Sequence, residues 1–202
     1  MMRPARTLDQ IIRNENEYTS DKGRDLARKY RVNLEKMVSE IRRHYSHTEL
    51  EFVYRPEPKT TEGIYFASQE GNPYSEQYLA IEMYSTTEYN TLQTDYSQRA
   101  ASVFLRYGLS LFDIVYRDKD IMAADDVYGI GITLQWMAKN FLSEKYFGGK
   151  REGIAVVTTK SVCGDFIEGK ITNQEFLRKS KVIGVQGDVP LGLIEIDLGK
   201  GL

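Results

Sequence analysis

Cysteine and histidine are scarce in this chain of 202 residues, which contains one cysteine and two histidines. A single cysteine cannot close a disulfide within the chain, and it cannot supply the several thiolates of a structural zinc site. The composition therefore excludes a small secreted domain held together by disulfides. It also leaves few side chains for nucleophilic or metal chemistry.

The chain also lacks an excess of charge of one sign and any long apolar segment. Its 27 basic and 29 acidic residues give a net charge of −2 and alternate along the sequence, so no surface for nucleic acid is expected. No stretch approaches the roughly 18 consecutive apolar residues of a membrane span. No apolar leader follows Met1, so the sequence as given predicts a cytoplasmic protein. If a leader has been removed, a periplasmic or envelope-attached location fits equally well.

The remaining composition is that of an ordinary globular protein, with 41% hydrophobic and 28% charged residues. The length suits one domain over residues 1–202. Thr7 and Gln10 form a capping-box pattern. We therefore expect residues 1–22 to contain a helix, loosely attached to the rest.

Two long segments have helical periodicity. In the first, apolar residues recur three or four positions apart and form one face: Leu26, Tyr30, Leu34, Met37, Ile41 and Tyr45. The second is predicted over residues 94–117, with Thr91 or Thr94 as its N-cap. Apolar side chains cover most of its circumference, so this helix must be covered on more than one side.

Alternating apolar residues predict strands elsewhere. Three lie at 50–55, 63–68 and 79–84, and short connections between them favour an antiparallel meander. Further strands are expected at 128–137, 154–159, 182–185 and 193–198, and short helices at 162–168 and from Thr172 to about Ser180. No parallel βαβ alternation is predicted. The order indicates an α+β fold, a largely antiparallel sheet with two long amphipathic helices packed on one face.

Cys163 is the one candidate nucleophile. It follows a predicted strand and lies in the first turn of a predicted helix, where the helix dipole would lower the pKa of a thiol. A cysteine nucleophile needs a base, which only His44 or His47 could be. This combination suggests a small cysteine-dependent hydrolase or transferase. The alternative is that Cys163 is a small buried residue on the inner side of a short helix.

Metal and cofactor sites lack a recognisable pattern. His44 and His47 are three residues apart, which is not the His-Glu-x-x-His spacing of a zinc site, and no metal site is predicted. Gly129 and Gly131 have no third glycine at dinucleotide-binding spacing, so no cofactor is predicted. We interpret the two glycines as a place where another segment packs close to the strand, or as a bulge.

The preferred hypothesis is a non-catalytic domain that binds another protein or forms a homo-oligomer. It would use the apolar helix 94–117 and the tyrosine-rich strand 76–84, because tyrosine and arginine are enriched at interfaces. The predicted binding residues are Tyr78, Tyr84, Tyr89, Tyr96, Arg99, Arg106 and Arg117. A cysteine-dependent enzyme and an envelope-associated protein are the two alternatives.

Overall fold

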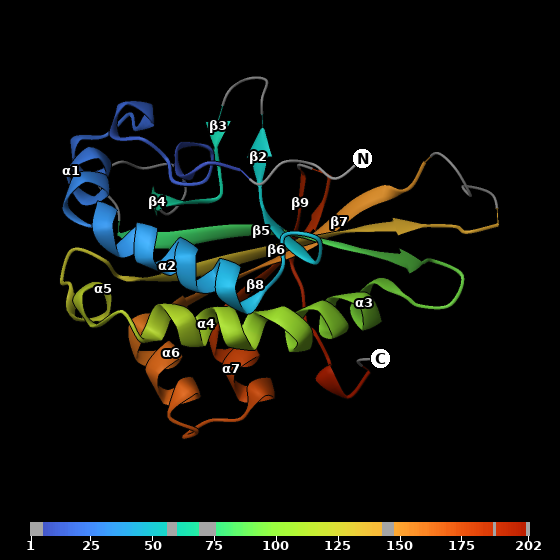
Figure 1. Ribbon diagram of the computed structural model, residues 1–202. Coiled ribbons are helices and arrows are strands. Elements are labelled where there is room, and N and C mark those ends of the chain that lie inside the picture. Colours follow the sequence, from blue (N-terminus) through green and yellow to red (C-terminus); the bar gives the residue numbers. More distant parts are fainter. Residues whose placement is uncertain (1–5, 56–59, 69–75, 143–147, 188, 201–202) are drawn as a thin grey trace.

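The computed structural model describes residues 6–55, 60–68, 76–142, 148–187 and 189–200. Seven strands form one sheet in the order β1-β5-β6-β7-β8-β9, and β4 also pairs with β5 (Figure 1). All pairs of neighbouring strands except β5–β6 are antiparallel. The predicted α+β fold with a largely antiparallel sheet is confirmed.

The strands of this sheet differ greatly in length. They are β1 (Leu50–Phe52), β4 (Ile64–Ser68), β5 (Gln77–Asn90), β6 (Gly129–Lys139), β7 (Lys150–Thr159), β8 (Lys181–Gln186) and β9 (Val189–Leu193). A separate two-stranded ribbon is formed by β2 (Tyr54–Arg55) and β3 (Thr60–Thr61). The predicted strand at 193–198 is wrong, because β9 ends at Leu193.

Strand β5 organises the sheet and overturns two predictions. β4 pairs with residues 77–81 of β5 and β1 with residues 83–85, so both lie on the same edge of one long strand. The predicted meander is therefore wrong. On its other edge β5 pairs with β6 in parallel, so the prediction that parallel alternation is absent is also wrong. The helix between β5 and β6 returns the chain to the edge of the sheet at which β5 begins, as a connection between parallel strands requires.

The first long amphipathic segment is two helices, α1 (Asp21–Lys29) and α2 (Arg31–His44), separated at Tyr30. Its apolar face is nevertheless as predicted, because all six residues of that face are buried. The N-terminal segment differs from the expectation. It forms two short 3₁₀ turns, η1 (Leu8–Gln10) and η2 (Glu15–Glu17), and both Ile11 and Ile12 are fully buried. Ile12 also bridges to Ile64 of β4, so this segment is part of the core.

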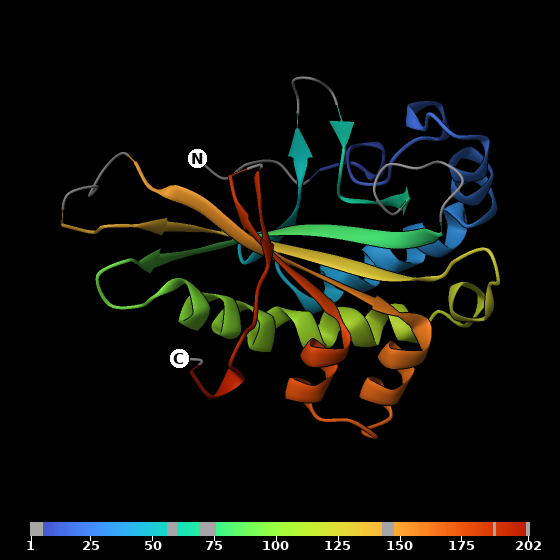
Figure 2. The same ribbon diagram turned by 180° about the vertical axis from the view of Figure 1, so that it is seen from behind.

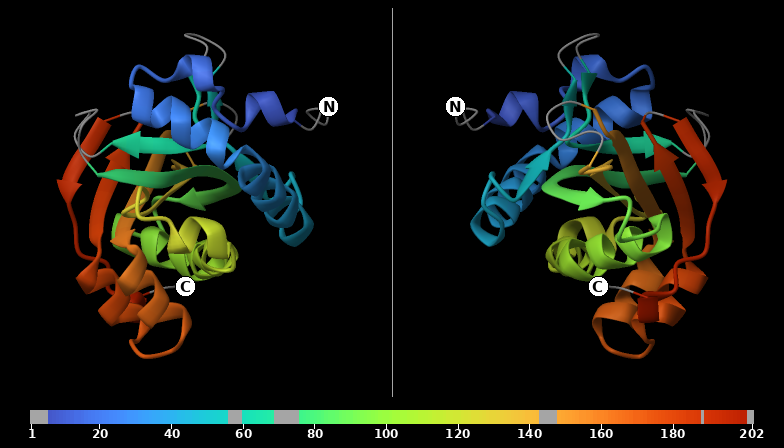
Figure 3. Two further views of the ribbon diagram at one scale, coloured as in Figure 1. Left: turned by 90° about the vertical axis from the view of Figure 1, so that its left-hand side faces the viewer. Right: turned by 90° about the vertical axis from the view of Figure 1, so that its right-hand side faces the viewer.

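The second long helix consists of α3 (Tyr96–Val103), a π-helical turn η4 (Phe104–Gly108) and α4 (Leu109–Tyr116). Asp95 caps it by accepting a hydrogen bond from the Gln98 N–H, so the predicted caps Thr91 and Thr94 are wrong. A carboxylate is well suited to this position, because it also complements the helix dipole. The sheet curls around this helix (Figure 3).

Shorter helices complete the covering of the long helix. α6 (Lys160–Ile167) and α7 (Asn173–Lys179) lie beside α4 (Figure 1). The contact is made by the rings of Phe104 on η4, Phe112 on α4, Phe166 on α6 and Phe176 on α7. Gly169 follows α6 with a φ of 72°, and Thr172 with Glu175 forms the capping box of α7, both as predicted. The remaining short helices are α5 (Lys119–Ala123) and η5 (Leu198–Lys200).

One face of the sheet forms the core, and none of the described helices packs on the other face (Figure 2). The inward side chains of β5, β6 and β7 are almost completely inaccessible: Leu79, Ile81, Met83, Ile130, Ile132, Leu134, Ile154 and Val156. Side chains between them in sequence point to the other face and are only partly covered. None of the described helices has the length and apolar character needed to cross a bilayer.

Candidate binding sites

Cys163 lies in the hydrophobic core and its side chain is inaccessible to solvent. Burial, together with the nearby charge of Asp113, raises the pKa of this thiol from 9.0 to about 12. A first-turn position on α6 would lower the pKa, but the loss of solvation is the larger effect here. At neutral pH Cys163 is a neutral thiol on the buried side of α6, which agrees with the interpretation of this residue as a small buried side chain.

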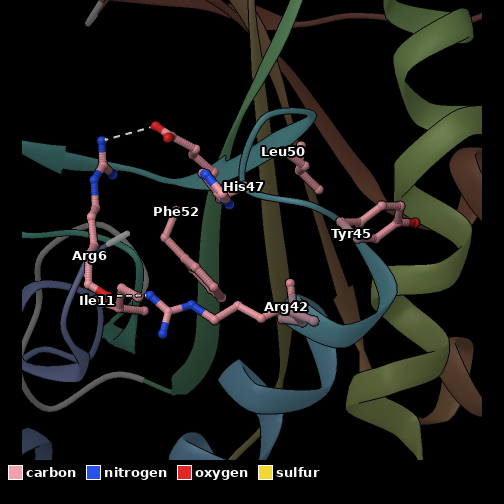
Figure 4. A pocket seen from close by; sticks show the side chains of 9 residues that line it. Arg6, Ile11, Arg42, Tyr45, His47, Leu50 and Phe52 are labelled. Carbon is pink, nitrogen blue, oxygen red and sulfur yellow. Dashed lines mark hydrogen bonds and ion pairs between the residues drawn. The ribbon is translucent and has the colours of Figure 1, made fainter. Parts of the chain in front are cut away.

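The two histidines lie at the end of α2 and in the loop after it. The ring of His44 packs edge-on against Tyr45, with 4.7 Å between the centroids. His47 faces Arg42 and Phe52 at the rim of a small cavity (Figure 4). Among the described residues, no three of the types His, Cys, Asp and Glu are grouped so that they could hold a metal ion.

The cavity beside His47 lies between the N-terminal segment, α2 and β1. Apolar side chains line it together with Arg6 and Arg42 (Figure 4), and Glu51 is a further lining residue. Arg6 lies 3.5 Å from the Glu51 carboxylate, and Arg42 donates to the main-chain carbonyl of Arg6. The free volume is about 30 Å³, which is close to the volume of one water molecule. We interpret these contacts as structural, because they hold the N-terminal segment against α2 and β1.

The three predicted binding arginines have different surroundings. Arg106 pairs with Glu49 at 2.9 Å, and Arg117 pairs with Glu40 at 3.1 Å and with Asp113, all at the surface. Arg99 is buried and forms a two-pronged ion pair with Glu152, with distances of 2.8 and 2.9 Å. The carboxylate that binds Arg99 thus comes from β7 of the same chain, so this arginine is not available at the surface.

Glu152 is the centre of a buried polar cluster that the sequence reading missed. Besides Arg99, it accepts a hydrogen bond of 3.1 Å from the indole N–H of Trp136, its register partner on β6. Arg99 also donates to the carbonyl of Thr94. The guanidinium and the carboxylate thus pair with each other and with Thr94 and Trp136 inside the core, where unpaired charge is costly. This cluster fastens the start of α3 to the sheet.

The four predicted tyrosines do not share one surface. Tyr89 and Tyr96 lie on the helix side of the sheet and pack against Trp136. The hydroxyl of Tyr96 donates to the Gly153 carbonyl at 2.5 Å, and burial raises its pKa to about 12. Tyr78 and Tyr84 lie on the open face, because residues of one parity along β5 point away from the core. Tyr89 has the other parity, that of Leu79, Ile81 and Met83, and therefore points to the core side of β5.

A groove crosses the open face of the sheet. Its centre is a single register row from β4 to β8: Tyr65, Ala80, Gly131, Val157 and Lys181. Small side chains form the floor, and the only heavy atom within 4 Å of a Cβ placed on Gly131 is a methyl of Val157 at 3.6 Å. The groove has a volume of about 340 Å³ and is also lined by Ala67, Ser68, Tyr78, Thr133 and Ile183.

The walls of this groove are held in place by contacts outside it. The Tyr65 hydroxyl donates to Glu82 at 2.5 Å, and the Arg13 guanidinium lies over its ring at 3.7 Å. Tyr78 packs edge-on against Tyr128, with 5.5 Å between the centroids. The groove is therefore a preformed hollow, and among its described lining residues Lys181 carries the one formal charge.

Strand β9 forms the outer edge of the sheet next to β8. Val189, Leu191 and Leu193 are 64%, 52% and 76% exposed, which is unusual for three large apolar side chains in five residues. The strand contains no charged residue. Pro190 and a register shift opposite Val185 interrupt its hydrogen-bonding pattern, so the strand does not present a regular edge for sheet extension.

The apolar surface of helix 94–117 is covered within the chain. The sheet, α2, α6 and α7 bury most of its described apolar side chains. Tyr96, Leu109 and Tyr116 are half-buried, and Leu105 is 36% exposed. Most of the apolar surface that the sequence predicted to be covered is thus covered by other elements of the same chain. The chain matches no known family model, and no curated protein or solved structure is significantly similar to it.

Proposed function

We propose that the protein is a non-catalytic domain that associates with a second copy of itself through β9. The observation that supports this proposal is the exposure of Val189, Leu191 and Leu193 on one short edge strand. Edge strands of monomeric proteins are protected by charged side chains, proline or bulges. Pro190 and the register shift protect the backbone edge of β9, but no charge covers its apolar side chains, which leaves them available for contact. The net charge of −2 adds little repulsion between two copies.

A second copy fits this edge because a two-fold interface places the same uncharged, apolar strand on both sides. The register shift directs Val189 and Leu193 to opposite sides of the strand, so the contact would be made along the edge rather than on one face of the sheet. Pro190 cannot donate a hydrogen bond, so we expect contact between side chains rather than one continuous sheet. At about 2 kcal/mol for each fully buried side chain, covering the exposed parts of six such residues contributes about 8 kcal/mol. The loss of rotational and translational freedom opposes this by a similar amount, which predicts a weak dimer.

Sedimentation velocity between 10 and 500 μM tests the proposal. The unaltered protein should shift toward a dimer with increasing concentration, and the Leu191→Lys, Leu193→Lys variant should stay monomeric because of like-charge repulsion. Val32→Lys is the matched control, since Val32 is 60% exposed on α2 and should not affect association. A monomer at all concentrations, or a dimer that the β9 variant retains, would refute the proposal.

A further inference from the structure

We infer that the groove on the open face of the sheet binds a small amphiphilic anion, an unbranched apolar chain ending in a carboxylate. This site borders the β9 surface, because Ile183 of its lining pairs with Leu193, but its residues are those of β4 to β8 and the inference does not depend on the proposed self-association. Three properties of the groove carry the inference: its shape, the chemistry of its floor, and the position of its one charge.

The shape is that of a trough across neighbouring strands. The central row runs through β4, β5, β6, β7 and β8, and strands lie about 4.8 Å apart, so the trough is about 19 Å long. The volume of about 340 Å³ is at the lower end of the range for small-molecule sites. A hollow whose lining extends across five strands accommodates an extended chain better than a compact ring system.

The floor of the groove favours apolar ligands that have no amide groups. Ala80, Gly131 and Val157 present aliphatic surface, and the main-chain N–H and C=O groups beneath them are already paired between strands. A peptide lying across this floor would find no partners for its own amide groups, and unpaired amides are costly to bury. A hydrocarbon chain has no such groups and displaces water from the floor favourably.

The charge lies at one end of the trough. Lys181 begins β8 and is exposed, while Tyr65 ends the same row on β4. A carboxylate at Lys181 gains a charge-assisted hydrogen bond, while the apolar chain extends over Val157 and Gly131 toward Tyr65. The hydroxyls of Ser68, Thr133 and Tyr78 line the rim and can bind the water at the edge of the ligand.

Decanoate is a suitable probe, and its binding can be followed by the shifts of amide signals in a ¹H–¹⁵N NMR titration. Signals of residues 129–133, 155–158 and 181–183 should move together. Decyltrimethylammonium, with the same chain and the opposite charge, should bind at least about tenfold more weakly. Lys181→Met should weaken decanoate binding by about tenfold and Lys181→Arg should restore it, whereas Lys179→Met on α7 should have no effect.

A second pair of variants tests the floor. Gly131→Leu should fill the trough and abolish binding of the probe, while Gly131→Ala should leave most of it, because a Cβ fits there without a clash. Equal affinity for the anionic and cationic probes would overturn the inference. So would decanoate binding that Gly131→Leu leaves unchanged, or tighter binding of an apolar peptide with a free carboxyl terminus.

Discussion

Replacing Glu152 by glutamine should destabilise the protein severely, because it leaves the guanidinium of Arg99 buried without a counter-charge. Both side chains are less than 10% exposed. Removing one member of such a pair costs about 3–5 kcal/mol, and a weakened hydrogen bond from Trp136 adds about 1 kcal/mol. Since small domains have about 5–15 kcal/mol in total, the variant should lose a large part of its free energy of unfolding.

The double variant Arg99→Met, Glu152→Met distinguishes burial of a lone charge from loss of the pair itself. Well-packed apolar residues can replace a buried ion pair at little cost, so the double variant should lose less than either single variant. The free energies of unfolding are measured by urea unfolding followed by circular dichroism. Fluorescence is unsuitable, because Trp136 contacts Glu152 and its signal would respond to the substitution itself. As control, Arg117→Met at the surface should cost under about 1 kcal/mol. A loss below about 1 kcal/mol for Glu152→Gln, or additive losses in the double variant, would refute the reasoning.

Two further predictions concern the core and β6. Cys163 keeps its proton to higher pH in the folded state than in the unfolded state, since its pKa is raised from 9.0 to about 12. Its contribution is therefore complete below about pH 8 and is lost as the pH rises from 9.0 toward about 12, with a loss of about 1.4 kcal/mol in total between pH 8 and 10. Buried tyrosines such as Tyr96 titrate in both proteins, so the measured quantity is the difference in free energy of unfolding between wild type and Cys163→Ala. This difference should change by about 1.4 kcal/mol from pH 8 to pH 10, and a constant difference would contradict the prediction. Gly129→Ala should lower the free energy of unfolding by about 1–3 kcal/mol, because its Cβ would lie 2.2 Å from the Thr158 carbonyl oxygen. Gly131→Ala should be nearly neutral, because a Cβ fits there. Equal urea unfolding midpoints for the two variants would contradict this prediction.

The sequence was sufficient to predict features that depend on local chemistry. The buried face from Leu26 to Tyr45, the capping box of Thr172 and Glu175, and the glycine that ends α6 follow from spacing and residue type alone. The interruption of the helix at Tyr30 does not disturb the apolar face, because α1 and α2 direct the same side toward the core. Periodicity predicted which side chains are buried better than it predicted where each helix begins.

Strand pairing could not be predicted in the same way. Alternation in β5 indicates a strand, but nothing in it indicates that β1 and β4 share one edge or that β6 is parallel. The groove depends on this register, since Ala80, Gly131 and Val157 come from three strands far apart in sequence. Glu152 did leave a signal. It has the same parity as Ile154 and Val156, which places a carboxylate on the apolar face of β7 and implies a buried partner.

The position of β5 has a consequence for synthesis of the chain. Its first edge is completed by β1 and β4, which precede it, but its second edge needs β6, and 38 residues separate Asn90 from Gly129. At a translation rate of about 5–20 residues per second, β6 follows β5 by about 2–8 s. During this interval the nascent chain carries an apolar strand with one open edge. Premature termination within helix 96–116 would release a fragment that cannot close its sheet and is prone to aggregate.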